Sequence, residues 1–232
     1  MINLYKIGGL PFWTEEEILR REQFIETLNL TMKIALKSIN KAFEMHRIEG
    51  SLMMPFDHVN AAYDDGDVFI NQKFAMRPET TNGSYLYARH LLNNGHKKPI
   101  CVWQAGKSFR VESNDGATAS KLRFNEFYQI EFQCIYSNES KADYMTHVSN
   151  YVKEIISELT FSETRIVDSD RLPSYSKKTI DVECIYNGDW KEMCSISLRT
   201  DFSDTDTVLE VAIGLDRLVM ANMKNRLLKL EG

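Results

Sequence analysis

The sequence predicts an α+β fold in which a largely antiparallel sheet is flanked by helices. The first observation is a succession of strand-like runs with few helical segments between them. The second is a pair of long segments, residues 14–46 and 143–159, whose apolar positions recur at helical spacing. The third is the lack of internal repeats and low-complexity linkers, which at 232 residues predicts a single domain over residues 1–232.

The first helix is expected to begin at a capping box, because Thr14 is followed three residues later by Glu17. Its apolar stripe consists of Ile25, Leu28, Met32, Leu36, Ile39 and Phe43. We expect a helix over residues 14–46 and then a strand over residues 47–55 that ends at Pro55. The stripe is larger than one small domain readily covers, so the helix and strand are predicted to form a homodimer interface.

A charged hairpin is predicted in the middle of the chain. Short strands at residues 68–70 and 99–104 precede it, and its first strand ends in Phe109-Arg110-Val111-Glu112. A polar, glycine-containing loop over residues 113–121 follows. The second strand, residues 122–132, carries Arg123, Glu126, Gln129 and Glu131. Such a hairpin either presents charge into a cleft, where an arginine binds an anion, or forms ordinary cross-strand ion pairs.

The last third of the chain is predicted to end in a strand followed by a helix. After the helix at 143–159, a polar stretch over residues 162–178 leads to strands at 179–186 and 193–198. The apolar run 209–213 then meets Gly214, and a helical pattern begins with Asp216 and Arg217. Glycine permits a tight junction, and Arg217 is either an anion ligand in the first helical turn or a surface charge on an amphipathic helix.

Composition excludes several classes of function. A net charge of −5 disfavours sequence-independent binding to nucleic acid. The four cysteines have no Cys-x-x-Cys spacing and lie in apolar runs, which predicts buried free thiols rather than a zinc site: Cys101, Cys134, Cys184 and Cys194. No apolar run approaches the ~20 residues that span a bilayer, and the start lacks a signal core. We expect a cytoplasmic protein with no membrane partner.

Three of these segments resemble the signature motifs of class II aminoacyl-tRNA synthetases: residues of about 24–56 (motif 1), 106–133 (motif 2) and 207–226 (motif 3). Others resemble the glycyl-tRNA synthetase branch, namely Met76-Arg77-Pro78-Glu79-Thr80-Thr81-Asn82-Gly83, residues 172–183, and Gly188-Asp189-Trp190-Lys191-Glu192 leading to Arg199-Thr200-Asp201-Phe202. The resemblance spans about residues 53–223. It implies a class II synthetase-type sheet and a homodimer built on motif 1.

The resemblance also implies an ATP site next to an amino-acid site. The catalytic pair would be Arg110, on the α-phosphate, and Arg217, on the γ-phosphate. The ATP site would also contain Glu112, Arg123 and Phe127, the last stacked on adenine. The amino-acid site would comprise Glu79, Gln129, Glu131, Arg199, Glu210 and Ala212, with the three glutamates on the ammonium group. Glu210 is also the candidate Mg²⁺ ligand.

The chain departs from the glycyl pattern in places that bear on its function. Glu210-Val211-Ala212 stands where that branch has Glu-Pro-Ser, and Asn125 stands where motif 2 has an arginine. Fifteen residues follow Arg217, so we expect no anticodon-binding domain. The expected function is ATP- and Mg²⁺-dependent adenylation of glycine or another small amino acid. The acceptor would be a carrier protein, small molecule or nucleic acid other than whole tRNA. A truncated synthetase that charges tRNA and a non-catalytic accessory subunit are the alternatives.

Overall fold

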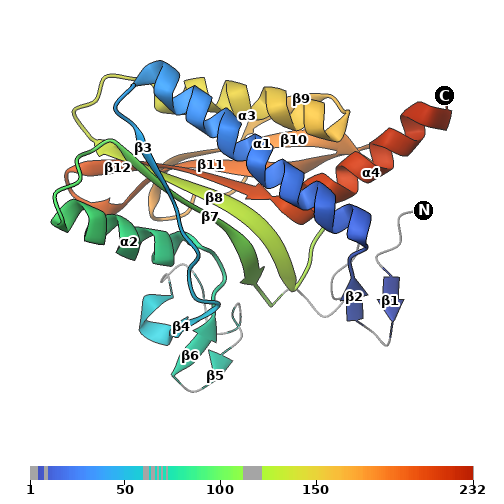
Figure 1. Cartoon of the computed structure of the whole chain (residues 1–232), viewed down its shortest axis with the longest axis horizontal. Helices are drawn as coiled ribbons and strands as arrows, with labels where there is room; N and C mark the ends of the chain where they lie inside the picture. Colours follow the sequence, from blue (N-terminus) through green and yellow to red (C-terminus); the bar gives the residue numbers. More distant parts are fainter. Residues whose placement is uncertain are drawn as a thin grey trace.

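A computed structural model describes residues 5–7, 10–59, 63, 66, 68, 70–71, 73–111 and 122–231. Its centre is a seven-stranded sheet in the order β3-β7-β8-β12-β11-β10-β9 (Figure 1). The strands are β3 (Glu44–Arg47), β7 (Ile100–Phe109), β8 (Glu126–Ser137), β12 (Asp206–Gly214), β11 (Asp189–Ser203), β10 (Ser176–Tyr186) and β9 (Thr164–Asp168). All neighbours pair antiparallel except β3 and β7. The predicted α+β class is confirmed.

Of the described helices, three cover one face of this sheet and one covers part of the other. One face packs against α1 (Glu15–Ile39), α3 (Tyr144–Thr160) and α4 (Leu215–Glu231), and α2 (Thr81–Asn93) lies on the other side (Figure 1). Alternation along β7 explains the split, because Cys101 and Trp103 belong to the large core whereas Ile100 and Val102 pack with α2. The part of the second face that α2 does not cover carries polar and charged side chains.

Helix α1 begins as predicted but ends seven residues early. Thr14 and Glu17 form the capping box, whereas the helix stops at Ile39 and residues 44–47 form β3. The expected helix to residue 46 was therefore wrong. Residues 41–46 are acceptable helix formers, but residues 44–47 pair in parallel with β7 instead. This override is tertiary, so local propensity does not reveal it.

The apolar stripe of α1 is covered within the chain. Leu28, Met32 and Leu36 are at most 1% exposed and belong to the main core, and α1 contacts both α3 and α4. The premise that this stripe needs a second copy to cover it was therefore wrong. The homodimer stays a prediction that rests on the family resemblance.

The strand expected at residues 47–55 is two strands in different sheets. β3 ends at Arg47, and β4 (Met53–Pro55) joins a small antiparallel sheet with β6 (Phe74–Met76) and β5 (Ile70–Asn71). The chain crosses between them at Gly50, where a Cβ would lie 3.1 Å from Gln104 Oε1. A one-turn helix follows β4 at Phe56–His58, and β1 (Tyr5–Ile7) pairs with β2 (Leu10–Phe12) near the N-terminus.

The remaining elements follow the predictions in part. α3 and the β12–α4 junction lie where the sequence placed them, whereas the strand expected at residues 68–70 is β5 at Ile70–Asn71, and the second hairpin strand, expected at residues 122–132, is β8 at Glu126–Ser137. The stretch at residues 162–178, expected to be irregular, contains the edge strand β9 and the start of β10. β9 carries no buried residue, so it lacks the alternation that would have revealed it. The four cysteines are free and buried, as predicted. None of the described helices is long and apolar enough to cross a membrane.

Candidate functional site

A cleft of about 960 Å³ lies on the polar face of the sheet. Most of the residues singled out from the sequence line it: Glu79, Arg110, Arg123, Phe127, Gln129, Glu131, Glu210, Ala212 and Arg217. Period-two alternation explains how β8 and β12 contribute, because Glu131 pairs directly with Ala212, and Gln133 with Glu210. Arg199 is completely buried. Glu112 lies outside the described residues.

Three buried glutamates meet at the start of α2. Oε2 of Glu131 accepts hydrogen bonds from the backbone nitrogen of Thr80 at 2.9 Å and from its hydroxyl group. The hydroxyl of Thr81 donates to Glu210 Oε2 at 3.0 Å and lies 3.4 Å from Glu131 Oε2, so it links the two carboxylates. The N-terminus of α2 therefore faces negative charge, as the helix dipole favours.

Glu79 is the third carboxylate and the least satisfied. Its Oε2 accepts a hydrogen bond from the Tyr63 hydroxyl at 3.0 Å. Its Oε1 is buried with no hydrogen-bond partner among the described residues, and Arg199 Nη1 lies 4.0 Å from it. A buried acceptor without a donor costs free energy, so this oxygen is suited to a donor that arrives with a ligand.

Arg199 forms ion pairs with two carboxylates, those of Glu210 and Asp201. Its Nη1 donates to Glu210 Oε2 at 2.7 Å, while Nε and Nη2 contact the two oxygens of Asp201 at 3.2 and 2.6 Å. The Tyr175 ring lies 4.0 Å from the guanidinium carbon. With its guanidinium occupied in this way, Arg199 orients Glu210 rather than lining the cleft.

The shared burial of these acids shifts their pKa values. Burial raises the pKa of Glu131 from 4.5 to about 7, the charges of Glu210 and Glu79 add to the shift, and the Thr80 hydrogen bond opposes it. Burial also raises the pKa of Glu79, against the opposing effect of Arg199. A ligand cation would lower both values, because it stabilises the ionised carboxylates.

This shift predicts a pH-dependent stability difference for Glu131→Gln. A carboxyl group with a raised pKa holds its proton longer in the folded than in the unfolded protein. Wild-type stability should therefore fall as pH rises from 4.5 to about 7. Glutamine does not titrate and so does not lose stability in this way. The free energy of unfolding of Glu131→Gln, relative to that of the wild type, should therefore rise by up to about 3 kcal/mol across that window. Urea unfolding at pH 4.5 and 8 measures it. The exposed Glu154→Gln should show no such growth, and a parallel pH profile for Glu131→Gln would refute the assignment.

The two predicted catalytic arginines lie on separate elements that both border the cleft. Arg110 follows the end of β7, where its backbone nitrogen bonds to Asn125 O at 2.9 Å. Its Nε donates to Pro78 O at 3.0 Å, and its guanidinium lies 5.1 Å from the centre of the Phe127 ring. Arg217 lies in the first turn of α4 and donates to backbone oxygens of Leu122 and Glu192, both at 3.0 Å.

The other predicted residues occupy the same cleft with different surroundings. Gln129 is buried and donates to Ser108 Oγ at 2.8 Å. Phe127 is half-buried and packs against the main core. Arg123 is exposed at the rim. Ala212 is half-buried beside Glu131.

Sequence reasoning missed several residues that shape the site. Gln133 donates from Nε2 to both Glu210 Oε2 and Thr81 Oγ1, at 2.8 and 3.1 Å. Alternation with Gln129 and Glu131 along β8 would have placed it on the same face. Tyr63 carried no comparable signal, since it approaches Glu79 through tertiary folding alone. Arg77, in the quoted Arg-Pro-Glu-Thr segment, is buried and donates to backbone oxygens of Gly50 and Lys107, so its contacts are structural.

Known proteins resemble this chain over much of its length. The family model described as "tRNA synthetase class II core domain (G, H, P, S and T)" matches residues 68–224. A glycine–tRNA ligase from Lachnospira eligens is 27% identical over 88% of this chain and 42% of that protein. One from Mycoplasmopsis synoviae is 28% identical over 63% of this chain and 38% of that protein. The chain thus spans less than half the length of these curated relatives.

A solved structure supports the fold independently. Prolyl-tRNA synthetase from Cryptosporidium parvum, complexed with halofuginone and AMPPNP, superposes with a TM-score of 0.74 at 14% identity, over 95% of this chain and 49% of that one. The structural likeness and the family model, which matches more than half of the chain, support the same assignment. The chain belongs to the class II tRNA synthetase core family.

Proposed function

We propose that the protein activates glycine or another small amino acid by adenylation with ATP. The observation that carries the proposal is a buried carboxylate cluster that shares one cleft with two arginines from different elements. The carboxylates match the ammonium end of an amino acid, and the arginines match the phosphates of a nucleotide. The names of the glycine–tRNA ligase relatives support glycine as the substrate.

The amino acid would bind with its ammonium group at Glu79. Oε1 of Glu79 is a buried acceptor without a hydrogen-bond partner among the described residues, and Glu131 lines the same cleft. Ala212 lies beside Glu131 on the neighbouring strand. A methyl side chain there leaves space for a small substituent, so alanine and serine are the competing substrates. Leucine and phenylalanine are expected to be poor substrates, because the polar residues around them would lose hydrogen bonds.

ATP would bind between Arg110 and Arg217, with adenine near Phe127. The presence of the nucleotide analogue AMPPNP in the prolyl-tRNA synthetase structure supports a nucleotide in this fold. The substrate carboxylate would attack the α-phosphorus, a bond to the bridging oxygen would break, and pyrophosphate would leave. Negative charge builds on the α-phosphate oxygens during attack, and the guanidinium of Arg110 would stabilise it.

Oε2 of Glu210, the oxygen that Arg199 contacts, is poorly suited to bind Mg²⁺. It already accepts hydrogen bonds from Arg199, Gln133 and Thr81. An arginine nitrogen 2.7 Å away repels a dication. Magnesium would instead enter as the MgATP complex, and Glu210 would act on the amino acid as a fixed, arginine-held carboxylate.

The acceptor of the activated amino acid is proposed to be something other than whole tRNA. A net charge of −5 supports this, because each missing cation reduces the counterion release that drives binding to phosphates. Asn125 supports it too, since it stands where an arginine is expected in motif 2. Charging of tRNA is the second candidate, and the names of the glycine–tRNA ligase relatives favour it.

Two assays separate these candidates. Amino-acid-dependent exchange of pyrophosphate with ATP tests adenylation across all twenty amino acids, and glycylation of full-length tRNA tests the acceptor. We expect exchange with glycine, alanine or serine and slow or absent charging of tRNA. Exchange with none of the amino acids would refute adenylation, and robust charging of glycine tRNA would replace the proposed acceptor with tRNA.

Substitution of Glu79 by glutamine should separate the two substrates. The change removes the negative charge that would face the ammonium group but keeps the size of the side chain. The KM for glycine in the exchange assay should rise by about tenfold or more, the scale of a hydrogen bond to a charged group. The KM for ATP should change far less. Equal increases in both KM values would contradict the placement of the ammonium at Glu79.

A further inference from the structure

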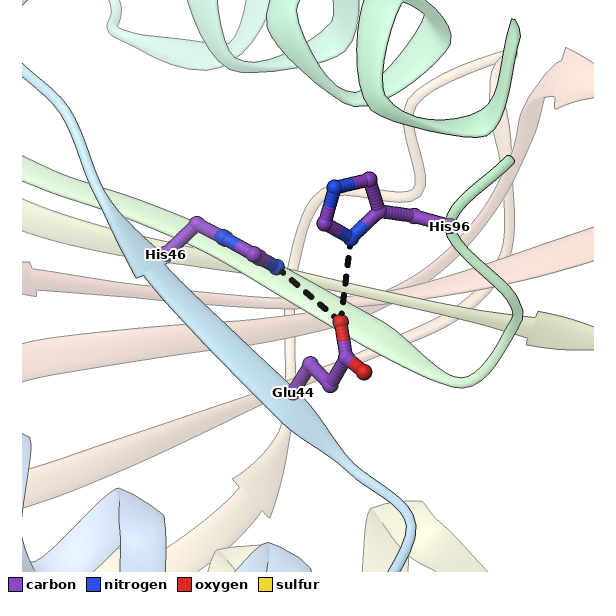
Figure 2. A group of neighbouring side chains, drawn as sticks. All are labelled: Glu44, His46 and His96. Carbon is purple, nitrogen blue, oxygen red and sulfur yellow. Dashed lines mark hydrogen bonds and ion pairs between the residues drawn. The ribbon is translucent and has the colours of Figure 1, made fainter. Parts of the chain in front are cut away.

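A cluster of one glutamate and two histidines lies at the β3 edge of the sheet, apart from the cleft. Glu44 and His46 are two residues apart on β3, so their side chains share one face of the strand. His96 lies between the end of α2 and the start of β7. Figure 2 shows both imidazole rings turned toward the Glu44 carboxylate. None of the three residues lines the ATP cleft.

One oxygen atom is the meeting point of the cluster. Oε2 of Glu44 lies 3.1 Å from His96 Nδ1 and 3.6 Å from His46 Nε2. The second distance is too long for a hydrogen bond. His46 Nε2 is nevertheless buried, with no hydrogen-bond partner among the described residues. Glu44 therefore does not satisfy the hydrogen-bonding capacity of His46 Nε2.

The spacing suits a shared cation. One atom from each of the three residues lies within 4.8 Å of the other two. Nitrogen and oxygen ligands lie about 2.0–2.2 Å from Zn²⁺, so neighbouring ligands of a tetrahedral site are about 3.3 Å apart. The distances from Glu44 Oε2 to His96 Nδ1 and His46 Nε2, 3.1 and 3.6 Å, bracket that separation. Small side-chain rotations would bring the two histidine nitrogens to the same spacing.

We propose that Glu44, His46 and His96 form a zinc-binding site with an open fourth position. Two imidazoles and one carboxylate are a donor set that Zn²⁺ accepts, leaving the fourth position to water. Glu44 and His46 also line a hollow of about 560 Å³ beside α1. Lys33, Lys37 and Arg47 line it too, so the carboxylate of Glu44 would be the anionic ligand that offsets their repulsion of a dication.

The bound ion would stabilise the pairing of β3 at the edge of the sheet. β3 has four residues and pairs with β7 alone in the described structure. Two ligands belong to β3 and the third to the turn before β7, so the ion would join the edge strand to its neighbour's connection. The turn is already ordered by the bond from His96 N to Leu91 O at 3.1 Å. Binding to the folded state alone would raise the melting temperature.

The test is calorimetric titration of chelator-treated protein with ZnCl₂. We expect saturable binding of one Zn²⁺ per chain, and a melting temperature that rises with Zn²⁺. His46→Gln and His96→Gln should each weaken binding by at least about tenfold, the loss that even an outer partner of a metal ligand causes. His58→Gln is the matched control, because this exposed histidine lies outside the cluster, and it should bind as the wild type does.

Co²⁺ gives a second, structural reading. A tetrahedral site should produce visible absorption bands that disappear in the His46 and His96 variants and persist in His58→Gln. Melting curves without metal verify that each variant folds. Non-saturable binding, or equal Zn²⁺ affinity in His96→Gln and wild type, would overturn the proposal and leave the three residues as an ion-pair cluster.

Discussion

Replacing Arg110 by alanine is expected to slow amino-acid-dependent pyrophosphate exchange by roughly a hundredfold to a thousandfold, equivalent to about 3–4 kcal/mol. Arg110 is fixed beside the cleft by its bonds to Pro78 and Asn125. A preorganised cation at the attacked phosphate acts mainly in the transition state, so kcat should fall more than the KM for ATP rises. Initial rates over a range of ATP and glycine concentrations measure both parameters.

Two further variants make this result specific. Arg110→Lys keeps the charge but loses the planar pair of donors, so we expect intermediate activity. Arg226→Ala removes an exposed arginine from α4 that pairs with Glu16 far along the helix from Arg217. It should leave exchange unchanged. Full activity in Arg110→Ala would refute the assigned role of this arginine.

Replacing Arg199 by methionine is expected to lower the free energy of unfolding by about 3–5 kcal/mol. The guanidinium is completely buried and is the cation that faces Glu210 and Asp201. Its removal leaves the Glu210 carboxylate buried without its positive partner, which costs more than the ion pair itself contributes. Denaturant unfolding at pH 7 measures the loss.

A double-mutant cycle tests whether unpaired charge is the cause. Combining Arg199→Met with Glu210→Gln removes both charges, so part of the lost stability should return and the two substitutions should not add. Arg199→Lys should lie between wild type and methionine, because lysine keeps the charge but not the two-pronged contact with Asp201. Strict additivity in the cycle would show that packing, rather than charge, explains the loss.

Much of the fold could be read from local signals. The capping box of Thr14 and Glu17 marked the start of α1, and Gly214 marked the junction of β12 with α4. The strand-like run at residues 122–132 indicated the second strand of the hairpin, which β8 overlaps from Glu126. These signals lie within a few residues of one another, so they do not depend on knowing where the rest of the chain goes.

The arrangement of the candidate site was only partly readable. The segment resemblances singled out Glu79, Glu131 and Glu210, and the structure brings them to one cleft. Their different surroundings were not in the sequence. Glu210 is held by Arg199, whereas Oε1 of Glu79 has no hydrogen-bond partner among the described residues. Arg199 and Glu210 are eleven positions apart on neighbouring strands, and Glu79 approaches Arg199 from 120 positions away, so both contacts depend on how these elements fold together.

By itself, the sequence determined the fold class and the starts of α1, β7, α3 and α4, because periodicity, capping and glycine act over short distances. The residues that share the cleft were singled out by the family resemblance. The tertiary structure decided that α1 ends at Ile39, that the chain passes from the large sheet to the small one at Gly50, and that β9 forms. It also decided that His96 meets Glu44 and His46. Each of these depends on a partner strand or turn brought in from elsewhere in the chain, and backbone pairing with that partner outweighs local propensity.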